Sequence, residues 1–127
     1  MHEFYGDVIY RFTREDAINQ GVLIDLALRY PEECRLYKYP VACTTSVWAL
    51  VEMATADQKH CNSHAGVIFD ILYMSQRGIF ARPDEQTVLF AVIITGTGNK
   101  RKHKLKAICH AGDNLEPVIT IMLPDED

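Results

Sequence analysis

The sequence predicts an α+β fold in a single domain over residues 1–127, with an N-terminal strand and helices followed by a three-stranded antiparallel meander. A chain of 127 residues fits one domain. Amphipathic helical patterns are confined to the first two thirds of the chain, and strand-like runs fill the last third. Such segregation of helices from strands is typical of α+β proteins with a mostly antiparallel sheet.

The first third of the chain is expected to hold one strand and short helices. Residues 7–13 (DVIYRFT) are rich in β-branched and aromatic residues, which predicts a strand. Thr13 and Asp16 have the spacing of a capping box, so a short helix should follow and end at Gly21. Residues 22–28 fit either a strand or the start of another helix, because periodicity does not separate the two.

Two longer helices are expected in the middle of the chain. Residues 44–54 begin with Thr44 or Thr45 as the cap, and residues 65–78 follow a cap at Asn62 or Ser63 and should end at Gly78. Apolar residues recur in both segments at the i, i+3, i+4 spacing of a buried helical stripe. In the second helix this stripe consists of Val67, Ile68, Ile71, Leu72 and Ser75.

Three strand-length runs separated by glycine-containing turns predict the meander. Residues 87–95 are nearly all apolar and predict a central strand covered on both faces. Residues 103–111 alternate between apolar and polar side chains, and residues 116–123 form the last strand. The core face of that last strand is assigned to Ile119, Ile121 and Leu123.

The acidic C-terminus is expected to be an ordinary charged strand end. Pro117 and Pro124 bracket the last strand, as proline is tolerated at strand ends. Asp125, Glu126 and Asp127 then discourage pairing between sheet edges. We expect that their removal costs well under about 1 kcal/mol of stability.

The distribution of charge indicates one candidate binding surface. The formal net charge of −4 is less acidic than that of a dedicated DNA mimic, and a general nucleic-acid binder would be basic. Two interpretations of a local basic run stay open: a solvated hairpin tip, or a patch that contacts nucleic-acid phosphate or an acidic partner surface. The run consists of Lys100, Arg101, Lys102, Lys104 and Lys106.

The sequence offers little that suggests a metal or cofactor. His60, Cys61 and His64 have spacings that can hold zinc, but a structural site needs four ligands and the other candidates are scattered singly. A polar loop is therefore favoured over a metal site. Residues 96–100 (GTGNK) lack the pattern of a phosphate-binding loop. No catalytic residue, metal or cofactor is predicted.

The cysteines and the N-terminus predict a cytoplasmic location. Four cysteines occur at irregular spacing without a C-x-x-C pair, and neither a signal peptide nor an apolar run of about 18 residues is visible. We therefore expect reduced thiols and no membrane partner, and we leave the oligomeric state open. The cysteines are Cys34, Cys43, Cys61 and Cys109.

One class of enzyme shows a generic likeness to the start of the chain. Small mono-ADP-ribosyltransferases often begin with a strand that carries a polar-aromatic triad and leads into a short helix. Tyr10, Arg11 and Thr13 are similar to that arrangement, and Glu85 or Glu116 would then be the catalytic acid. Core strand residues and a helix cap explain the same residues, so this enzyme class is the alternative hypothesis.

Four stretches of the chain together resemble a known family. They are VIYRFTREDAINQGVLIDL, PVACTTSVW, IFDILYM and the C-terminal GDNLEPVITIMLPDED. In this order they resemble an uncharacterised family of small proteins from phages, plasmids and bacterial genomes. RLYKY at residues 35–39 departs from the Gly-Phe type of sequence expected there.

The resemblance implies a context and assigns no catalytic residues. Small proteins of mobile elements are often accessory factors that act by binding. The expected function is inhibition of a host defence nucleoprotein complex, of the anti-CRISPR or anti-restriction type, with a protein or nucleoprotein partner. Such an inhibitor needs a rigid scaffold and a charged surface, and no active site.

Overall fold

A computed structural model describes residues 12–56 and 58–126. The strand expected over residues 7–13 therefore lies almost entirely outside the described residues. No helix in the described part of the chain is long and apolar enough to cross a membrane. The elements in chain order are α2 (Arg14–Asn19), β1 (Leu23–Asp25), α3 (Leu26–Arg29), η1 (Glu33–Leu36), β2 (Val41–Thr44), α4 (Thr45–Ala56), η2 (Gln58–His60), α5 (His64–Ala81), β3 (Thr87–Ile93), β4 (Lys102–Ala111) and β5 (Pro117–Met122).

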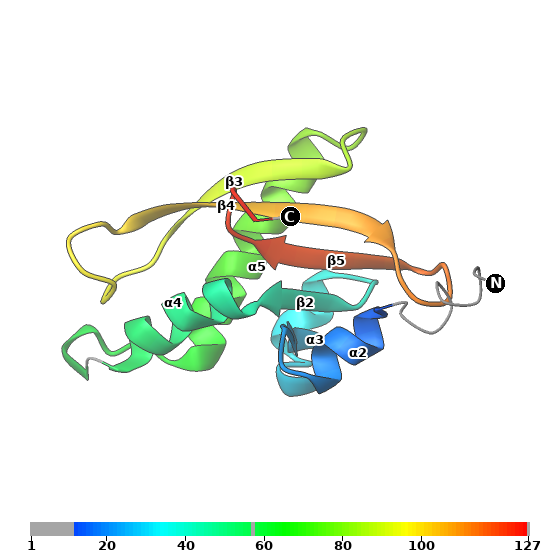
Figure 1. Ribbon diagram of the computed structural model, residues 1–127. Coiled ribbons are helices and arrows are strands. Elements are labelled where there is room, and N and C mark those ends of the chain that lie inside the picture. The colour runs from blue at the N-terminus through cyan, green and yellow to red at the C-terminus, as the bar shows by residue number, and fades with distance from the viewer. Residues whose placement is uncertain (1–11, 57, 127) are drawn as a thin grey trace.

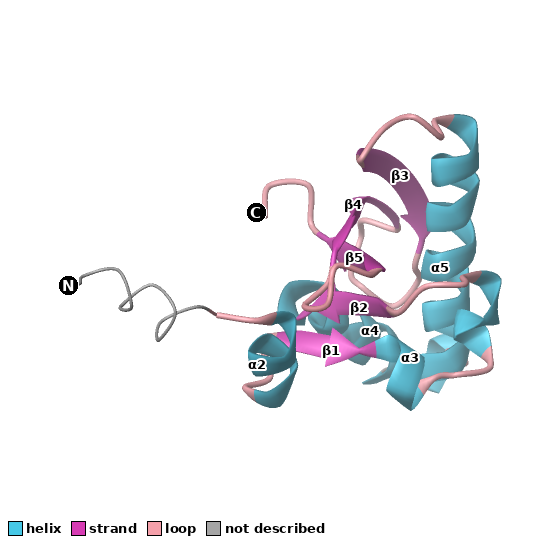
Figure 2. Cartoon of the chain, turned by 90° about the vertical axis from the view of Figure 1, so that its right-hand side faces the viewer, coloured by secondary structure: helices cyan, strands magenta, loops and turns pink. Residues whose placement is uncertain are grey.

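The strands form one five-stranded mixed sheet in the order β1-β2-β5-β4-β3 (Figure 1). β2 and β5 run parallel, and the other neighbours run antiparallel. Helix α5 lies on one face of the sheet, while α2 and the end of the C-terminal tail lie on the opposite side (Figure 2). The α+β class is confirmed, but the expected three-stranded meander is only part of a larger mixed sheet.

The sequence prediction missed the strand that completes this sheet. Val41, Ala42 and Cys43 of β2 have no exposed surface, because they are enclosed between β1, β5 and α4. Four residues are too few to establish a period, so residues 41–43 are assigned to no element from the sequence. Residues 22–28, for which strand and helix both stayed open, contain β1 followed directly by α3.

The predicted helix starts and the buried stripe are confirmed. The Thr13 hydroxyl accepts the backbone N–H of Asp16, whose carboxylate accepts the N–H of Thr13 in return. Gly21 has the left-handed φ of +77° expected after this helix. Ser63 caps α5 through the N–H of Gly66. All five residues of the α5 stripe are buried: Val67, Ile68, Ile71, Leu72 and Ser75.

The prediction that Gly78 ends the helix is wrong, because α5 continues to Ala81. Gly78 faces β3, and a Cβ atom at this position would lie 3.1 Å from Cγ1 of Val88 and 3.3 Å from Cβ of Phe90. The glycine therefore allows the helix to approach the sheet closely. The sequence identifies Gly78 as a residue without a side chain, but it does not indicate that strand β3 packs against this position.

The prediction of a central strand over residues 87–95 is also wrong. In the described part of the chain β3 is the outer strand of the sheet, paired only with β4. Val88, Phe90 and Val92 face the helices, whereas Leu89 and Ile93 are 55% and 56% exposed on the other face. The continuous apolar run thus combines a buried face with an exposed apolar face.

Both faces of β5 are buried, although only one was assigned to the core. Ile119 and Ile121 join the helix-covered core as predicted, and Leu123 packs against it. The second face is equally protected, since its three residues are at most 6% exposed: Val118, Thr120 and Met122. β5 is the middle strand of the sheet, so neighbours on both sides contribute to this burial.

Candidate functional site

The basic run predicted from the sequence lies on the β3–β4 hairpin. Two of its residues precede strand β4, and three lie on the strand. Lys102, Lys104 and Lys106 alternate with Leu105 and Ala107, which are buried in the core. These three lysines therefore lie on the face of β4 that points away from α5, spaced about 7 Å apart along the strand.

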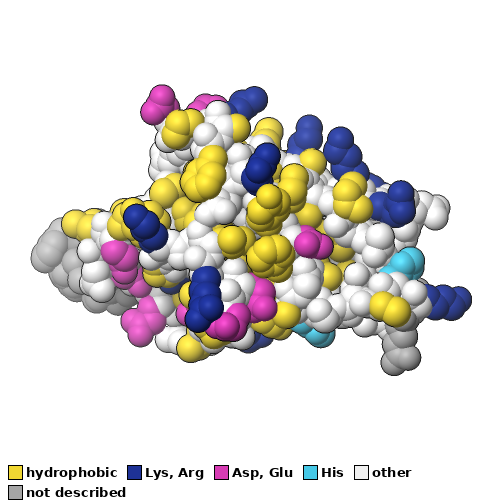
Figure 3. Space-filling model, turned by 180° about the vertical axis from the view of Figure 1, so that it is seen from behind, with side chains coloured by type: hydrophobic (Ala, Val, Ile, Leu, Met, Phe, Trp, Pro, Cys, Tyr) yellow, Lys and Arg dark blue, Asp and Glu magenta, His cyan; other side chains and the backbone are white. Residues whose placement is uncertain are grey.

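Lys100 and Arg101 precede the strand and are exposed, as are Lys102 and Lys104. Lys106 is half-buried, and its ammonium group donates to the backbone carbonyl of Glu126. Four cations thus remain exposed at the hairpin, and the fifth anchors the C-terminal tail. Figure 3 shows Lys and Arg side chains gathered at the upper right, above the hairpin end of the molecule.

Exposed apolar side chains lie directly beside these cations. In the register of the hairpin Ile93 is opposite Lys102 and Ala91 is opposite Lys104. Leu89 is opposite Lys106, so the apolar row continues past the exposed lysines. We define the hairpin face as Leu89, Ile93, Lys102 and Lys104. It presents adjoining apolar and cationic rows on two paired antiparallel strands.

The C-terminal tail forms the border of this face. The Glu126 carboxylate accepts the Thr44 hydroxyl at 2.8 Å and the backbone N–H of Leu123 at 2.7 Å. Together with the Lys106 contact, these bonds attach the tail to β2 and β4. These contacts argue against the expectation of an expendable acidic end, because they give Glu126 a structural role. The run of three acidic residues indicated a solvated chain end, and no local pattern in the sequence distinguished Glu126 from its two neighbours.

A hollow of about 440 Å³ lies between the tail and β1 on the same side of the sheet. Its polar lining includes Glu126 and His110, whose Nε2 lies 2.8 Å from the Thr120 hydroxyl. Its apolar lining includes Ile108 and Met122. The sequence prediction did not include His110 in any site, because the facing strands that build this hollow could not be paired from the sequence.

His103 belongs to the interior of the hairpin. Its Nε2 lies 2.8 Å from the Thr97 hydroxyl oxygen, and the single hydroxyl hydrogen of Thr97 is shared between the carbonyls of Ile94 and Lys100, each 3.0 Å away. Partial burial and, secondarily, the positive charge of Lys100 lower the pKa of His103. The residue therefore stabilises the turn in its neutral form and adds no charge to the hairpin face.

The segment containing His60, Cys61 and His64 does not assemble a metal centre in the described residues. No group of three or more His, Cys, Asp or Glu side chains there could hold a metal ion. Asn62 fixes the segment, since its amide donates to the carbonyls of Ala54 and Thr95 at 3.1 and 3.0 Å. This loop therefore joins the end of α4 to the end of β3.

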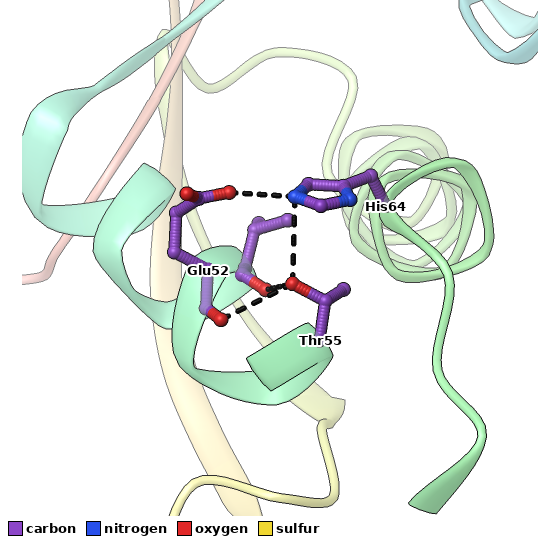
Figure 4. Close-up of polar contacts among 4 residues, drawn as sticks. Glu52, Thr55 and His64 are labelled. Atoms are coloured by element: carbon purple, nitrogen blue, oxygen red, sulfur yellow. Dashed lines mark hydrogen bonds and ion pairs between the residues drawn. The ribbon is translucent and has the colours of Figure 1, made fainter. Parts of the chain in front are cut away.

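His64 takes part in a polar cluster on the exposed side of α4 and α5 (Figure 4). Its Nε2 lies 2.6 Å from a Glu52 carboxylate oxygen and 3.4 Å from the Thr55 hydroxyl. A catalytic Thr–His–Glu relay would use the two different ring nitrogens for these partners. Here one nitrogen meets both, and Thr55 also donates to backbone carbonyls in α4. The cluster joins two helices and does not have the geometry of an activated nucleophile.

The residues of the alternative enzyme hypothesis have structural roles where they are described. Tyr10 and Arg11 lie outside the described residues, and Thr13 caps α2. The Glu116 carboxylate accepts the N–H of Asn114 in the β4–β5 turn. Glu85 forms an exposed ion pair with Arg82 at 3.5 Å. None of these contacts indicates a catalytic acid.

Cys34 and Cys43 are free thiols that are buried in the core. Comparison with curated proteins and with solved structures finds no match. A model of a protein family does match residues 1–127. Since this match spans the whole sequence, the chain belongs to the family described as a family of unknown function (DUF6573).

Proposed function

We propose that this protein acts by binding, and that its hairpin face contacts an acidic surface of a protein partner. The observation that carries the proposal is that exposed Ile93 lies opposite exposed Lys102, with exposed Leu89 and Lys104 further along the same two rows. Apolar rows beside charges of one sign are typical of an interface core with a charged rim.

An acidic protein surface fits this face better than nucleic acid does. A phosphate backbone would use the lysines but would leave Leu89 and Ile93 without apolar partners. The hairpin face also has no aromatic side chain on which a base could stack. The formal net charge of −4 opposes a polyanion at long range, so only a partner that adds apolar contacts offsets this repulsion.

The biological context of the proposal comes from the family resemblance. In a phage or plasmid setting the partner would be a protein of a host defence nucleoprotein complex, blocked as anti-CRISPR and anti-restriction proteins block theirs. A rigid sheet with an exposed charged face suits such occlusion, because the interface backbone of pre-organised complexes moves little on binding.

Affinity capture from bacterial lysate tests the proposal. The bait is the wild type, the double variant Lys102→Glu with Lys104→Glu, or the control Arg35→Glu with Lys38→Glu, which has the same net charge on another surface. We expect a partner that the wild type and control retain and the hairpin variant loses, before and after nuclease treatment.

Further measurements with the purified partner complete the test. Its affinity should fall with salt, and the hairpin variant should reduce mainly the association rate. Loss of the partner on nuclease treatment would indicate nucleic acid in place of a protein. Equal capture by all three baits would reject the hairpin face.

A further inference from the structure

The open edge of the sheet at β3 carries a second, independent inference. Ile94 donates its N–H to the carbonyl of Arg101, and Cys109 donates to the carbonyl of Gln86. Even-numbered residues of this strand therefore bond to β4. In an antiparallel ladder the odd-numbered residues then direct their N–H and C=O groups to the open edge. These residues are Thr87, Leu89, Ala91 and Ile93.

This edge lacks the features that prevent strands from pairing. β3 reads TVLFAVI, with no proline, no glycine and no charged residue over seven positions. Natural proteins protect exposed edges with charges, prolines, bulges or a covering segment. In the described part of the chain no strand covers the outer edge of β3. A long apolar edge of this kind is a template for another strand.

The helix beside the edge adds an apolar surface. A groove of about 390 Å³ runs between α5 and β3, lined mainly by apolar side chains with one charge of each sign. Its lining residues are Asp70, Tyr73 and Met74 on the helix and Ala91, Val92, Ile93 and Lys102 on the sheet. Tyr73 and Met74 are 41% and 38% exposed. An added strand would therefore gain side-chain contacts with the helix as well as backbone hydrogen bonds.

Charges at the two ends of the edge indicate which strand is added. Asp84 and Glu85 precede β3, and because Arg82 pairs with Glu85 this loop keeps one net negative charge. Lys100 and Arg101 lie beside the other end, where Arg101 pairs with Ile94. Figure 3 shows acidic side chains beside one basic side chain at the upper left, several basic ones at the upper right, and mainly hydrophobic side chains between them. An antiparallel second copy would place each acidic end against a basic end.

We propose that two copies of this chain associate through antiparallel pairing of their β3 edges. A two-fold axis at the strand centre makes the contact self-complementary, as a closed dimer requires. The two sheets become one ten-stranded sheet, with both α5 helices on one face and both hairpin faces on the other. The dimer goes beyond the proposed function and does not depend on it.

A charge-swap experiment tests the pairing by sedimentation velocity. The acidic variant carries Lys100→Glu with Arg101→Glu, and the basic variant carries Asp84→Lys with Glu85→Lys. Each variant alone brings like charges together at both ends of the edge, so its dimer dissociation constant should rise at least about tenfold. An equimolar mixture should recover a dimer, because every end then meets its opposite charge.

The control Arg35→Glu with Lys38→Glu separates this effect from net charge. It should dimerise like the wild type and should not form a preferential dimer with the basic variant. Leu89→Lys, at an exposed position of the edge, should also weaken dimerisation and keep the wild-type circular dichroism spectrum. A wild type that stays monomeric up to about 1 mM, or acidic and basic variants that each dimerise like the wild type, would overturn the proposal. Lys102 also lines the groove beside this edge, so sedimentation of the Lys102→Glu with Lys104→Glu variant shows whether its loss of partner capture is separate from a loss of the dimer.

Discussion

At the scale of single residues, Glu126 shows how one side chain can determine the role of a whole terminus. Its carboxylate accepts two hydrogen bonds, from Thr44 and from the backbone of Leu123, and its carbonyl accepts the Lys106 ammonium. Asp125 beside it is exposed and has no comparable contact among those described. Two neighbouring acids therefore differ in function although they look alike in the sequence.

Replacing this carboxylate should destabilise the protein measurably. Hydrogen bonds to a charged group contribute about 1.5–3 kcal/mol when they are well formed, and partial exposure of Glu126 reduces that amount. We expect Glu126→Ala to lower the free energy of unfolding by about 1–3 kcal/mol in urea titration. Asp125→Ala is the matched control and should change it by less than about 0.5 kcal/mol. Equal effects of the two substitutions would show that the tail is not attached through Glu126.

Buried weak acids predict a loss of stability in alkali. Burial raises the pKa of Cys43 from 9.0 to about 12 and that of Cys34 to about 11. Burial also raises the pKa of Tyr37 from 10.0 to about 12, although its hydrogen bond with Ser75 opposes this. The unfolded chain releases these protons at lower pH than the folded chain does. Stability should therefore be fully present below about pH 9 and decline as the pH rises towards 12.

Urea titrations between pH 7 and 11 measure this decline. The slope of stability against pH should be smaller for Cys43→Ala, because one of the buried thiols no longer ionises on unfolding. An unaltered slope in the Cys43 variant would contradict the assignment.

At the scale of the elements, helix α5 packs closely against strand β3 because Gly78 has no side chain at the contact. Gly78 costs the helix roughly 1 kcal/mol relative to alanine in an exposed position. In this structure an added methyl group would meet Val88 and Phe90 at 3.1 and 3.3 Å. Overpacking of this kind costs about 1–3 kcal/mol, so it exceeds the gain in helix propensity.

We therefore expect Gly78→Ala to lower the free energy of unfolding, by up to about 2 kcal/mol, and Gly78→Val to lower it further. Thermal unfolding followed by circular dichroism measures both. The double variant Gly78→Ala with Val88→Ala removes the nearest contact and should lose less stability than the two single changes summed. Stabilisation by Gly78→Ala alone would show that the helix does not press on β3.

The elements that the sequence predicted well are those with a long period or a local signal. The α5 stripe spans more than two helical turns, and Thr13 and Ser63 bond within three residues of their own position. β2 and the edge position of β3 depend on partners far along the chain. The parallel pairing of Ala42 with Thr120, for example, joins segments that share no local pattern.

The candidate site follows the same division. The sequence located the cations of the hairpin, because charge is visible in the letters themselves. It did not locate Leu89 and Ile93 beside them, since a strand covered on both faces would have buried these side chains. It also grouped Lys106 with the exposed lysines, because only the folded chain brings Glu126 to it.

At the scale of the whole molecule, β5 joins two parts that are separate in sequence. On one side β5 pairs with β2, which in turn pairs with β1. On the other side it pairs with β4, which in turn pairs with β3. The core residues of α4 and α5 belong to the same apolar cluster as Ile119 and Ile121. Because β5 is shared, neither half of the sheet has a complete core without it.

Ile121→Ala should therefore weaken the entire domain as one unit. Ile121 has no exposed surface, and truncating such a side chain costs about 2–5 kcal/mol, a large share of the roughly 5–15 kcal/mol that stabilise a small domain. Trp48 fluorescence reports on α4, and far-ultraviolet circular dichroism reports on all elements. Both probes should give one shared urea midpoint, which moves down together in the variant. If the Trp48 transition stayed in place while the circular dichroism transition moved, the β1–β2 half would be folding independently of β5.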